Sequence, residues 1–145
     1  MTLYAKKGPR VGLNAHLLSV SQTYRAAGVS RYIQSLIRHL PRVDGGLEYH
    51  AYLGRSGMSP AGWVTHRAPW STEHPVARIS WEQLALPRDA RGHKLDLLHV
   101  PVYVGPLAAP CPLIVSVHDL SFFRYPELFP RVKRYYLQPL SLIHI

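Results

Sequence analysis

A histidine and an aspartate, His118 and Asp119, follow directly on the most strand-like segment of the chain. That segment, residues 113–117, reads Leu-Ile-Val-Ser-Val, and such an aliphatic, β-branched run is typical of a strand buried on both faces of a parallel sheet. In open parallel sheets, ligands bind outside the carboxyl ends of the strands. A histidine placed there can hydrogen-bond a substrate hydroxyl or respond to a charge that develops during a reaction. We therefore predict a ligand site at His118.

Both residues also have a structural interpretation. His118 could cap the end of its strand or bond to nearby backbone, although its place at a strand end favours the functional role. Asp119 is more typical of a residue that caps the following turn, because aspartate side chains bond to backbone amides close in sequence. We keep Asp119 as a candidate substrate-binding residue with that alternative open.

Two more polar residues are candidates for binding a substrate. His99 ends a neighbouring predicted strand, residues 95–100, so it could line the same crevice, and a histidine of the core explains it equally well. Glu82 lies in a predicted helix, residues 76–86, from which it could reach a substrate hydroxyl. A glutamate on a helix more often faces solvent, and this alternative is the stronger one for Glu82.

A glycine marks the start of the best-defined helix, residues 29–40. Apolar residues recur there at positions 29, 32, 33, 36, 37 and 40, and Pro41 is expected to end the helix. A helix N-terminus presents unpaired N–H groups and glycine has no Cβ, so Gly28 and Val29 could bind a phosphate. A glycine that only serves the loop geometry is an equally good explanation. Neither a Gly-x-Gly-x-x-Gly fingerprint nor a P-loop motif occurs.

Strands and helices that would position these residues alternate along the chain. Strands are predicted at residues 10–15, 49–53, 63–67, 95–100 and 113–117, and helices at 29–40, at 76–86 before Pro87, and from residue 130 onward. This order predicts an α/β fold in which a Rossmann-like, mostly parallel sheet is flanked by helices.

Composition narrows the choice of partner and compartment. The chain has 145 residues and a net charge of +9, from 17 basic against 8 acidic residues, which favours an anionic partner such as a nucleotide diphosphate or a lipid head group. The basic residues are scattered, so we do not expect a nucleic-acid partner. The single cysteine, Cys111, excludes an internal disulfide, and the nine histidines show no metal-ligand spacing. Without a signal peptide or an apolar span, we expect a cytoplasmic protein, and peripheral contact with a membrane stays open as an addition to this location.

Five segments, in the same order and at the same spacing, resemble the N-terminal domain of family 4 glycosyltransferases, retaining enzymes of the B-type fold with two Rossmann-like domains. The segments are RVGLNA at 10–15, GVSRYIQSLIRHL at 28–40, RISWEQLALP at 78–87, DLLHVP at 96–101 and VSVHDLSFFRYPELF at 115–129.

The resemblance implies an enzyme that moves a sugar from a nucleotide-activated donor to a carbohydrate or lipid-linked acceptor, with retention and without an essential metal or other cofactor. It places Gly28 near the donor diphosphate and His118 near the transferred sugar, and it gives residues 1–139 to the acceptor-side domain. The second domain, which carries the nucleotide-sugar site, has no counterpart here, so we expect this portion alone to be inactive.

Residues 140–145, Leu-Ser-Leu-Ile-His-Ile, equal the in-frame translation of a transposase adapter end used in sequencing libraries. We therefore expect the natural sequence to depart from this one near Pro139. A non-catalytic α/β module that binds a phosphorylated or glycosylated ligand is the alternative to the enzyme. A nucleotide-dependent oxidoreductase is disfavoured, because the glycine fingerprint is missing.

Overall fold

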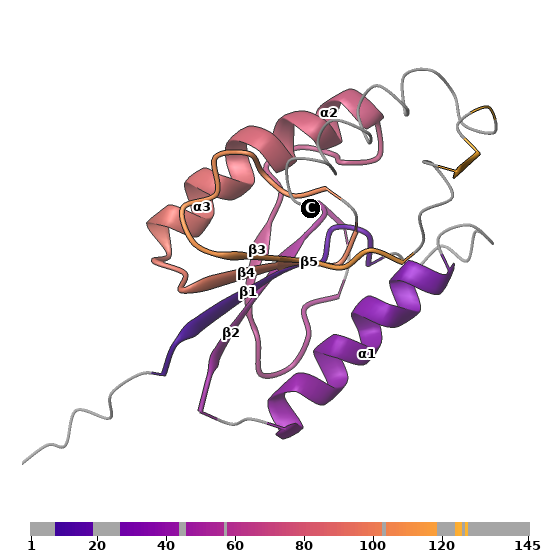
Figure 1. Ribbon diagram of the computed structural model, residues 1–145. Coiled ribbons are helices and arrows are strands. Elements are labelled where there is room, and N and C mark those ends of the chain that lie inside the picture. Colours follow the sequence, from indigo (N-terminus) through magenta and orange to yellow (C-terminus); the bar gives the residue numbers. More distant parts are fainter. Residues whose placement is uncertain are drawn as a thin grey trace, which may run out of the picture.

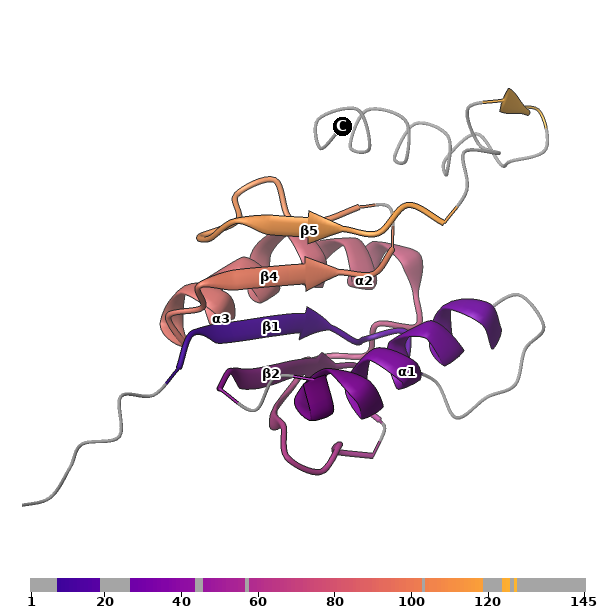
Figure 2. The same cartoon turned by 60° about the horizontal axis from the view of Figure 1, so that its bottom comes forward.

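The computed structural model describes residues 8–18, 27–43, 46–56, 58–102 and 104–118, together with residues 124, 125 and 127. These residues form a five-stranded, all-parallel sheet with the order β3-β2-β1-β4-β5 (Figures 1 and 2). Its strands are β1 (Arg10–Asn14), β2 (Glu48–Leu53), β3 (Val64–Arg67), β4 (Leu97–Val100) and β5 (Leu113–Val115). The helices are α1 (Ala27–Val43), α2 (Pro75–Ser80), the π-helix η1 (Trp81–Ala85) and α3 (Leu86–Gly92). The predicted Rossmann-like α/β fold is confirmed.

The strand order reverses between β1 and β4. From β1 the chain adds β2 and β3 on one side of the sheet, and it then returns to add β4 and β5 on the other. In open parallel sheets, ligands bind at such a topological switch point, outside the carboxyl ends of the strands. The carboxyl ends of β1 and β4 flank this point here.

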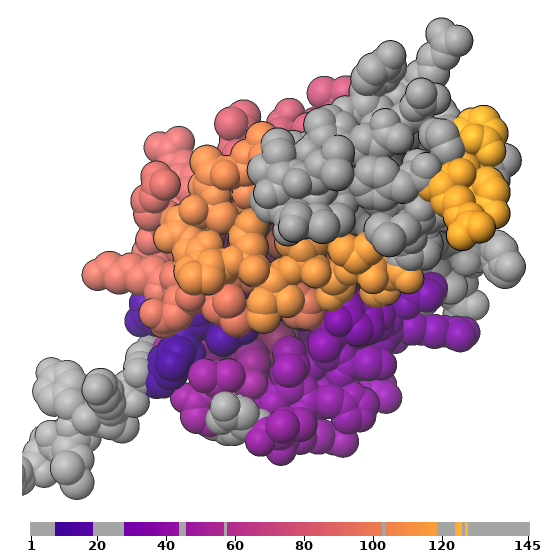
Figure 3. All heavy atoms as spheres, viewed as in Figure 1, coloured from indigo at the N-terminus to yellow at the C-terminus, as the bar shows by residue number. Residues whose placement is uncertain are grey.

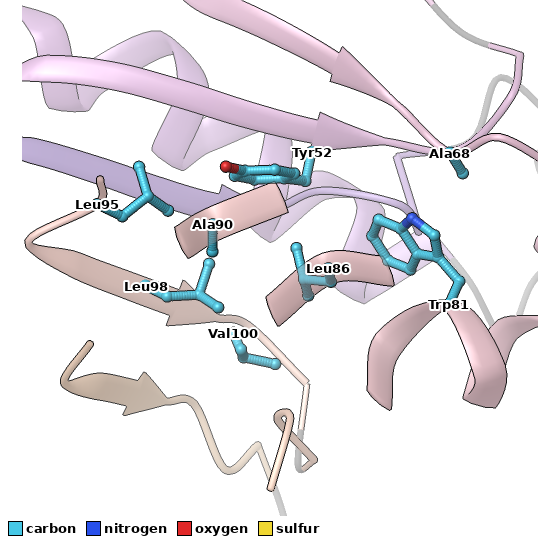
Figure 4. Packing of buried hydrophobic residues seen from close by; sticks show 8 residues of the cluster. All are labelled: Tyr52, Ala68, Trp81, Leu86, Ala90, Leu95, Leu98 and Val100. Carbon is cyan, nitrogen blue, oxygen red and sulfur yellow. The ribbon is translucent and has the colours of Figure 1, made fainter. Parts of the chain in front are cut away.

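Helices cover both faces of the sheet (Figure 1). Against one face, Ile33 of α1 packs on Leu13 and Leu53. On the other face lies a cluster from η1, α3 and the sheet, shown in Figure 4: Tyr52, Ala68, Trp81, Leu86, Ala90, Leu95, Leu98 and Val100. Gly12 of β1 allows this second layer to approach closely, because a Cβ there would clash with Leu95.

Strand alternation decides which face each residue of β4 reaches. Leu98 and Val100 belong to the cluster on the α3 face. His99 lies between them and pairs in register with Leu13, which packs beneath α1. Side chains of registered residues share a face, so His99 is directed toward α1.

The expectation that Pro41 ends the first helix is wrong, because α1 continues to Val43. A proline in a helix leaves the carbonyl four residues earlier without its N–H donor. That carbonyl belongs to Ile37, and the indole N–H of Trp63 donates to it at 3.1 Å. A side chain distant in sequence therefore replaces the missing bond.

The expectation that Pro87 ends the second predicted helix is also wrong. The helical segment continues through α3 to Gly92. At the end of η1, the N–H of Leu86 bonds to the carbonyl of Trp81, five residues earlier, and this shifts the hydrogen-bond register. Pro87 then lies in the first turn of α3, where a missing N–H is tolerated.

The prediction that residues 113–117 are buried on both faces is wrong as well. β5 ends at Val115 and is an edge strand of the described sheet, and Ile114 and Val117 remain 48% and 41% exposed. An edge strand has a neighbour on one side only, so its side chains are covered less. The helix predicted from residue 130 and the expected boundary near Pro139 lie outside the described residues. In the part of the chain that the structure describes, no helix is both long and apolar enough to cross a membrane.

Candidate functional site at the carboxyl ends of the strands

Three side chains from different elements meet beside the ends of β4 and β5. His99 Nε2 lies 2.9 Å from the hydroxyl of Ser116, and the hydroxyl of Tyr32 on α1 lies 3.1 Å from the same Ser116 oxygen. The backbone N–H of Ser116 donates to the carbonyl of Val100 at 2.9 Å, which holds Ser116 against β4. In the space-filling view, residues 104–118 (orange) lie against α1 (Figure 3).

The hydrogen bonds that join Tyr32, Ser116 and His99 form a chain in which the direction of one bond fixes the direction of the next. Burial lowers the pKa of His99, so its imidazole is neutral at pH 7. A serine hydroxyl has a single proton to donate. Ser116 therefore donates to one of its two neighbours and accepts from the other, so the proton positions on Tyr32, Ser116 and His99 depend on one another.

His118 is held from two sides. Its Nε2 lies 2.7 Å from the carbonyl oxygen of Pro101, and since a carbonyl can only accept, Nε2 carries a proton and donates. The Tyr32 ring meets the imidazole edge-on, with ring centroids 5.1 Å apart and an angle of 86°. The predicted structural role, a bond to backbone, is therefore present. The ring nevertheless remains on the surface at the carboxyl end of β5.

Gly28 lies in the first turn of α1, four residues before Tyr32 and hence on the same side of the helix. A Cβ built at Gly28 would meet no atom within 4 Å, and the residue has no left-handed backbone angle. Neither crowding nor backbone conformation therefore requires glycine here. Val29 differs, because its side chain packs into the core beneath α1, and only its backbone could face a ligand.

Glu82 lies at the carboxyl end of β1, in a second polar group. It is buried, with 6% of its surface exposed, so the expectation of a solvent-facing glutamate is wrong. Its Oε1 atom is 3.5 Å from Nε2 of His16, the second residue after β1, and the His16 ring lies 5.3 Å from the Trp81 ring. The π-helical turn carries Glu82, and such turns are frequent at functional sites.

The structure brings together His118 and His99 through Tyr32, and Gly28 lies on the same side of α1. Glu82 joins His16 instead, and Asp119 lies outside the described residues. Reasoning from sequence missed three residues of these groups: Tyr32, Ser116 and His16. Ser116 had a signal, as the one polar residue in the aliphatic run at 113–117. Another signal was that His16 directly follows a predicted strand, residues 10–15, as His118 follows the predicted strand at 113–117.

No metal centre emerges from the described ranges, where no group of three or more His, Cys, Asp or Glu side chains could hold an ion. A scan against protein-family models found no match, and neither did searches of the curated proteins and of the solved structures. The family resemblance therefore rests on the five sequence segments, with which the observed fold is compatible.

Proposed function

We propose that the chain is the acceptor-side portion of a retaining glycosyltransferase, which moves a sugar from a nucleotide-activated donor to an acceptor. The observation that carries the proposal is the contact between Tyr32 and His118 beside the carboxyl ends of β4 and β5, with Gly28 one helical turn before Tyr32 on α1. Two of these residues are the ones to which the resemblance assigns the donor diphosphate and the transferred sugar. The strand order 3-2-1-4-5 is also typical of Rossmann-like nucleotide-binding folds.

The first turn of α1 is suited to an anionic group. It contains no acidic residue, so no carboxylate competes for the positive end of the helix dipole. The space beside Gly28 lets a phosphate approach the backbone N–H groups closely. In the proposed reaction, these amides stabilise the negative charge that develops on the departing diphosphate.

His118 is the proposed contact to the transferred sugar. The bond to Pro101 and the edge contact with Tyr32 fix the direction of its ring before a ligand binds. A fixed ring positions a sugar hydroxyl without an ordering cost at the moment of reaction. Tyr32 is in turn linked to Ser116 and His99, so the network is the support of the proposed catalytic residue His118.

The remaining features complete the proposal. We assign the chain to the cytoplasm, at the inner face of a membrane, because its net charge of +9 suits anionic lipids and a lipid-linked or polysaccharide acceptor. A second domain is proposed to supply the nucleotide-sugar site, so that these residues alone have little or no activity. No metal has a role in the proposed reaction.

The test is an assay of the full-length gene product against a panel of nucleotide sugars, with His118→Ala beside the wild type. His39→Ala is the matched control, because His39 is an exposed histidine on the last turns of α1. We expect transfer with one donor, a loss of about 10²-fold or more in His118→Ala, and no loss in the control. Full transfer by His118→Ala would move the site elsewhere. No turnover with any donor would contradict the enzyme and favour a binding module.

A further inference from the structure

The outer side of the helical layer formed by α2, η1 and α3 carries large apolar side chains that face solvent. Val76 and Leu84 are 66% and 69% exposed, and Leu107, on the loop before β5, is 54% exposed. The inner side of the same layer packs on the sheet through buried residues such as Trp81 and Leu86. The described core does not use the three exposed side chains, so folding does not explain their apolar character.

These apolar side chains follow one another along the layer. Trp70, itself 37% exposed, donates its indole N–H to the carbonyl of the residue that follows Val76, at 2.9 Å, and therefore lies beside Val76. Leu84 comes about two turns after Val76 along the same layer. The N–H of Leu107 donates to the side chain of Gln83 at 3.0 Å, which places Leu107 beside Leu84. The four apolar residues therefore form two neighbouring pairs.

Basic residues continue the same line into α3. Arg88 and Arg91 are exposed, and they come four and seven residues after Leu84, so they share its side of the layer. Between residues 75 and 94, every exposed charged residue is basic, because Glu82 is buried and Asp89 is half-buried. We refer to the following residues together as the α2–α3 surface: Trp70, Val76, Leu84, Arg88, Arg91 and Leu107.

Helix α1, on the other face of the sheet, is basic in a different way (Figure 1). It contains the exposed residues Arg31, Arg38 and Arg42 and no acidic residue. The other exposed residues between Arg31 and Arg42 are polar, and an exposed apolar side chain, Val43, occurs at the last residue of the helix. A surface that rests on a bilayer needs apolar side chains that enter the interface as well as basic residues that attract anionic head groups. The α2–α3 surface combines the two along its length.

Trp70 is suited to the same environment. Indole rings concentrate at the boundary between membrane and water, because they are large, apolar and carry one polar N–H. The N–H of Trp70 is already bonded within the chain, to the carbonyl of Ala77. Its ring can therefore enter the lipid interface without leaving an unpaired donor behind.

We propose that the α2–α3 surface binds the anionic head groups of a lipid bilayer. Trp70, Val76 and Leu84 enter the interfacial layer, and Arg88 and Arg91 contact the head groups. The inference goes beyond the proposed function, because it assigns a lipid-binding face to the molecule and requires no sugar transfer. A second copy of the chain is disfavoured as the occupant, since each copy has a net charge of +9 and would present the same arginines.

The test uses the chain itself and co-sedimentation with two kinds of vesicle, one of phosphatidylcholine alone and one of equal parts of phosphatidylglycerol and phosphatidylcholine. The double variant Arg88→Gln, Arg91→Gln removes two charges from the α2–α3 surface. Arg38→Gln, Arg42→Gln is its matched control, because it removes two charges from exposed positions on α1. We expect the chain to bind the anionic vesicles at least about tenfold more tightly than the neutral ones. The Arg88, Arg91 variant should lose about tenfold or more in binding, and the control less than about threefold.

The apolar contribution has its own pair of variants. Leu84→Ser removes an apolar side chain from the surface, and Val43→Ser removes one that is 84% exposed at the end of α1. We expect Leu84→Ser to weaken binding to the anionic vesicles by about fivefold and Val43→Ser to leave it unchanged. Circular dichroism of each variant checks that the fold is intact.

Lipids with brominated acyl chains give an independent readout of insertion. The chain has three tryptophans, of which Trp63 and Trp81 are buried, so a quencher within the bilayer reaches Trp70. We expect brominated anionic vesicles to quench part of the tryptophan emission, and this quenching to disappear in Trp70→Phe. If Leu84→Ser does not fold, the arginine variants and this quenching decide.

Several outcomes would overturn the lipid-binding surface. They are no binding to the anionic vesicles, equal losses in the two arginine double variants, or binding that leaves Trp70 unquenched. A dimer that forms without lipid and is dissociated by Leu84→Ser would assign the surface to a second copy instead. Failure here is separable from failure of the proposed function, because vesicle binding is measured without a sugar donor. Sugar transfer by a full-length protein whose α2–α3 surface does not bind vesicles would contradict this inference and leave the transferase in place.

Discussion

Two groups of histidines in this molecule have opposite characters. His99 and His118 lie at the carboxyl ends of β4 and β5, and they bond to a hydroxyl and to a backbone carbonyl. His50, His66 and His93 instead form a stack on the α3 face of the sheet: the His66 and His93 rings are 3.9 Å apart, and His50 Nδ1 lies 2.9 Å from His66 Nε2.

Neighbouring side chains supply polar partners for the rings of the stack. Tyr52 places its hydroxyl 3.2 Å from Nδ1 of His93, and Glu48 places a carboxylate oxygen 3.1 Å from Nε2 of His50. These histidine rings mainly pack against one another and against Tyr52. A cluster of histidines can therefore belong to the packing of this fold, whereas His99 and His118 lie where open parallel sheets bind ligands.

The largest effect on stability is expected from acid, and the stack should cause a large part of it. Burial, with the nearby charges of His93 and His50, lowers the pKa of His66 to about 4, and burial also lowers that of His50 despite Glu48. An unfolded histidine titrates near 6.5, so between pH 6.5 and pH 4 the unfolded state binds more protons. The protonation of His66 should therefore lower the free energy of unfolding by about 2 kcal/mol over this range as the pH falls, and His16, whose pKa burial lowers to about 3, adds a further loss of the same sign.

Urea unfolding at pH 7.5 and pH 4.5 checks this, with His66→Phe as the variant and His39→Phe as the exposed control. Phenylalanine preserves the ring stack and cannot be protonated, so the part of the loss in acid that comes from His66 should disappear in His66→Phe, while the part that comes from the buried His16 remains. An unchanged pH dependence in His66→Phe would show that the stack is not its source.

A smaller effect on stability is expected from the hydrogen bonds that join Tyr32, Ser116 and His99. Ser116→Ala removes the hydroxyl that links Tyr32 to His99, and it should destabilise the fold by about 1 kcal/mol. In the full-length protein, the same change should lower the transfer rate, because Tyr32 would lose one of the contacts that hold it against His118. His66→Phe is the matched comparison, since it alters the stack and should leave transfer at pH 7.5 intact. If Ser116→Ala and His66→Phe lowered the transfer rate equally, the strand-end histidines and the stack could not be distinguished by their role in transfer.

The smallest effect on stability is expected at Gly28, and it has the opposite sign. Alanine is favoured over glycine in a helix, and a Cβ at this position meets no atom within 4 Å. Gly28→Ala should therefore stabilise the chain by up to about 0.5–1 kcal/mol. The same methyl group should raise the KM for the donor in the full-length protein. A stabilised variant with an unchanged KM would separate Gly28 from the proposed diphosphate site.

Much of the sheet could be predicted from sequence, because strand residues such as Leu13 and Leu98 occur in short aliphatic runs. The effect of Pro41 and Pro87 on their helices could not be predicted correctly from sequence. The carbonyl left free by Pro41 is satisfied by Trp63, 26 residues from Ile37, and Pro87 is accommodated by a π-turn that periodicity does not reveal. The low burial of β5 follows from its place at the sheet edge, and strand order is not readable from the segment itself.

Residues of the candidate site could be proposed from sequence only where the strand-end rule applied, as for His118 and His99. Tyr32 looked like part of the apolar helix face, and its contact with Ser116 joins residues 84 apart in sequence. His16 looked like a loop residue until Glu82 was found beside it. Contacts of this kind depend on the assembled fold, so local patterns do not contain them.

The central claim is that sugar transfer takes place beside His118 at the carboxyl ends of β4 and β5. The most direct measurement is a titration of the full-length protein with the nucleotide sugar that it turns over, followed by NMR at the imidazole nitrogens of its histidines. The account predicts that the resonances of His118 and His99 move, while those of His50, His66 and His93 stay in place. Movement of the stack with His118 unchanged would contradict it.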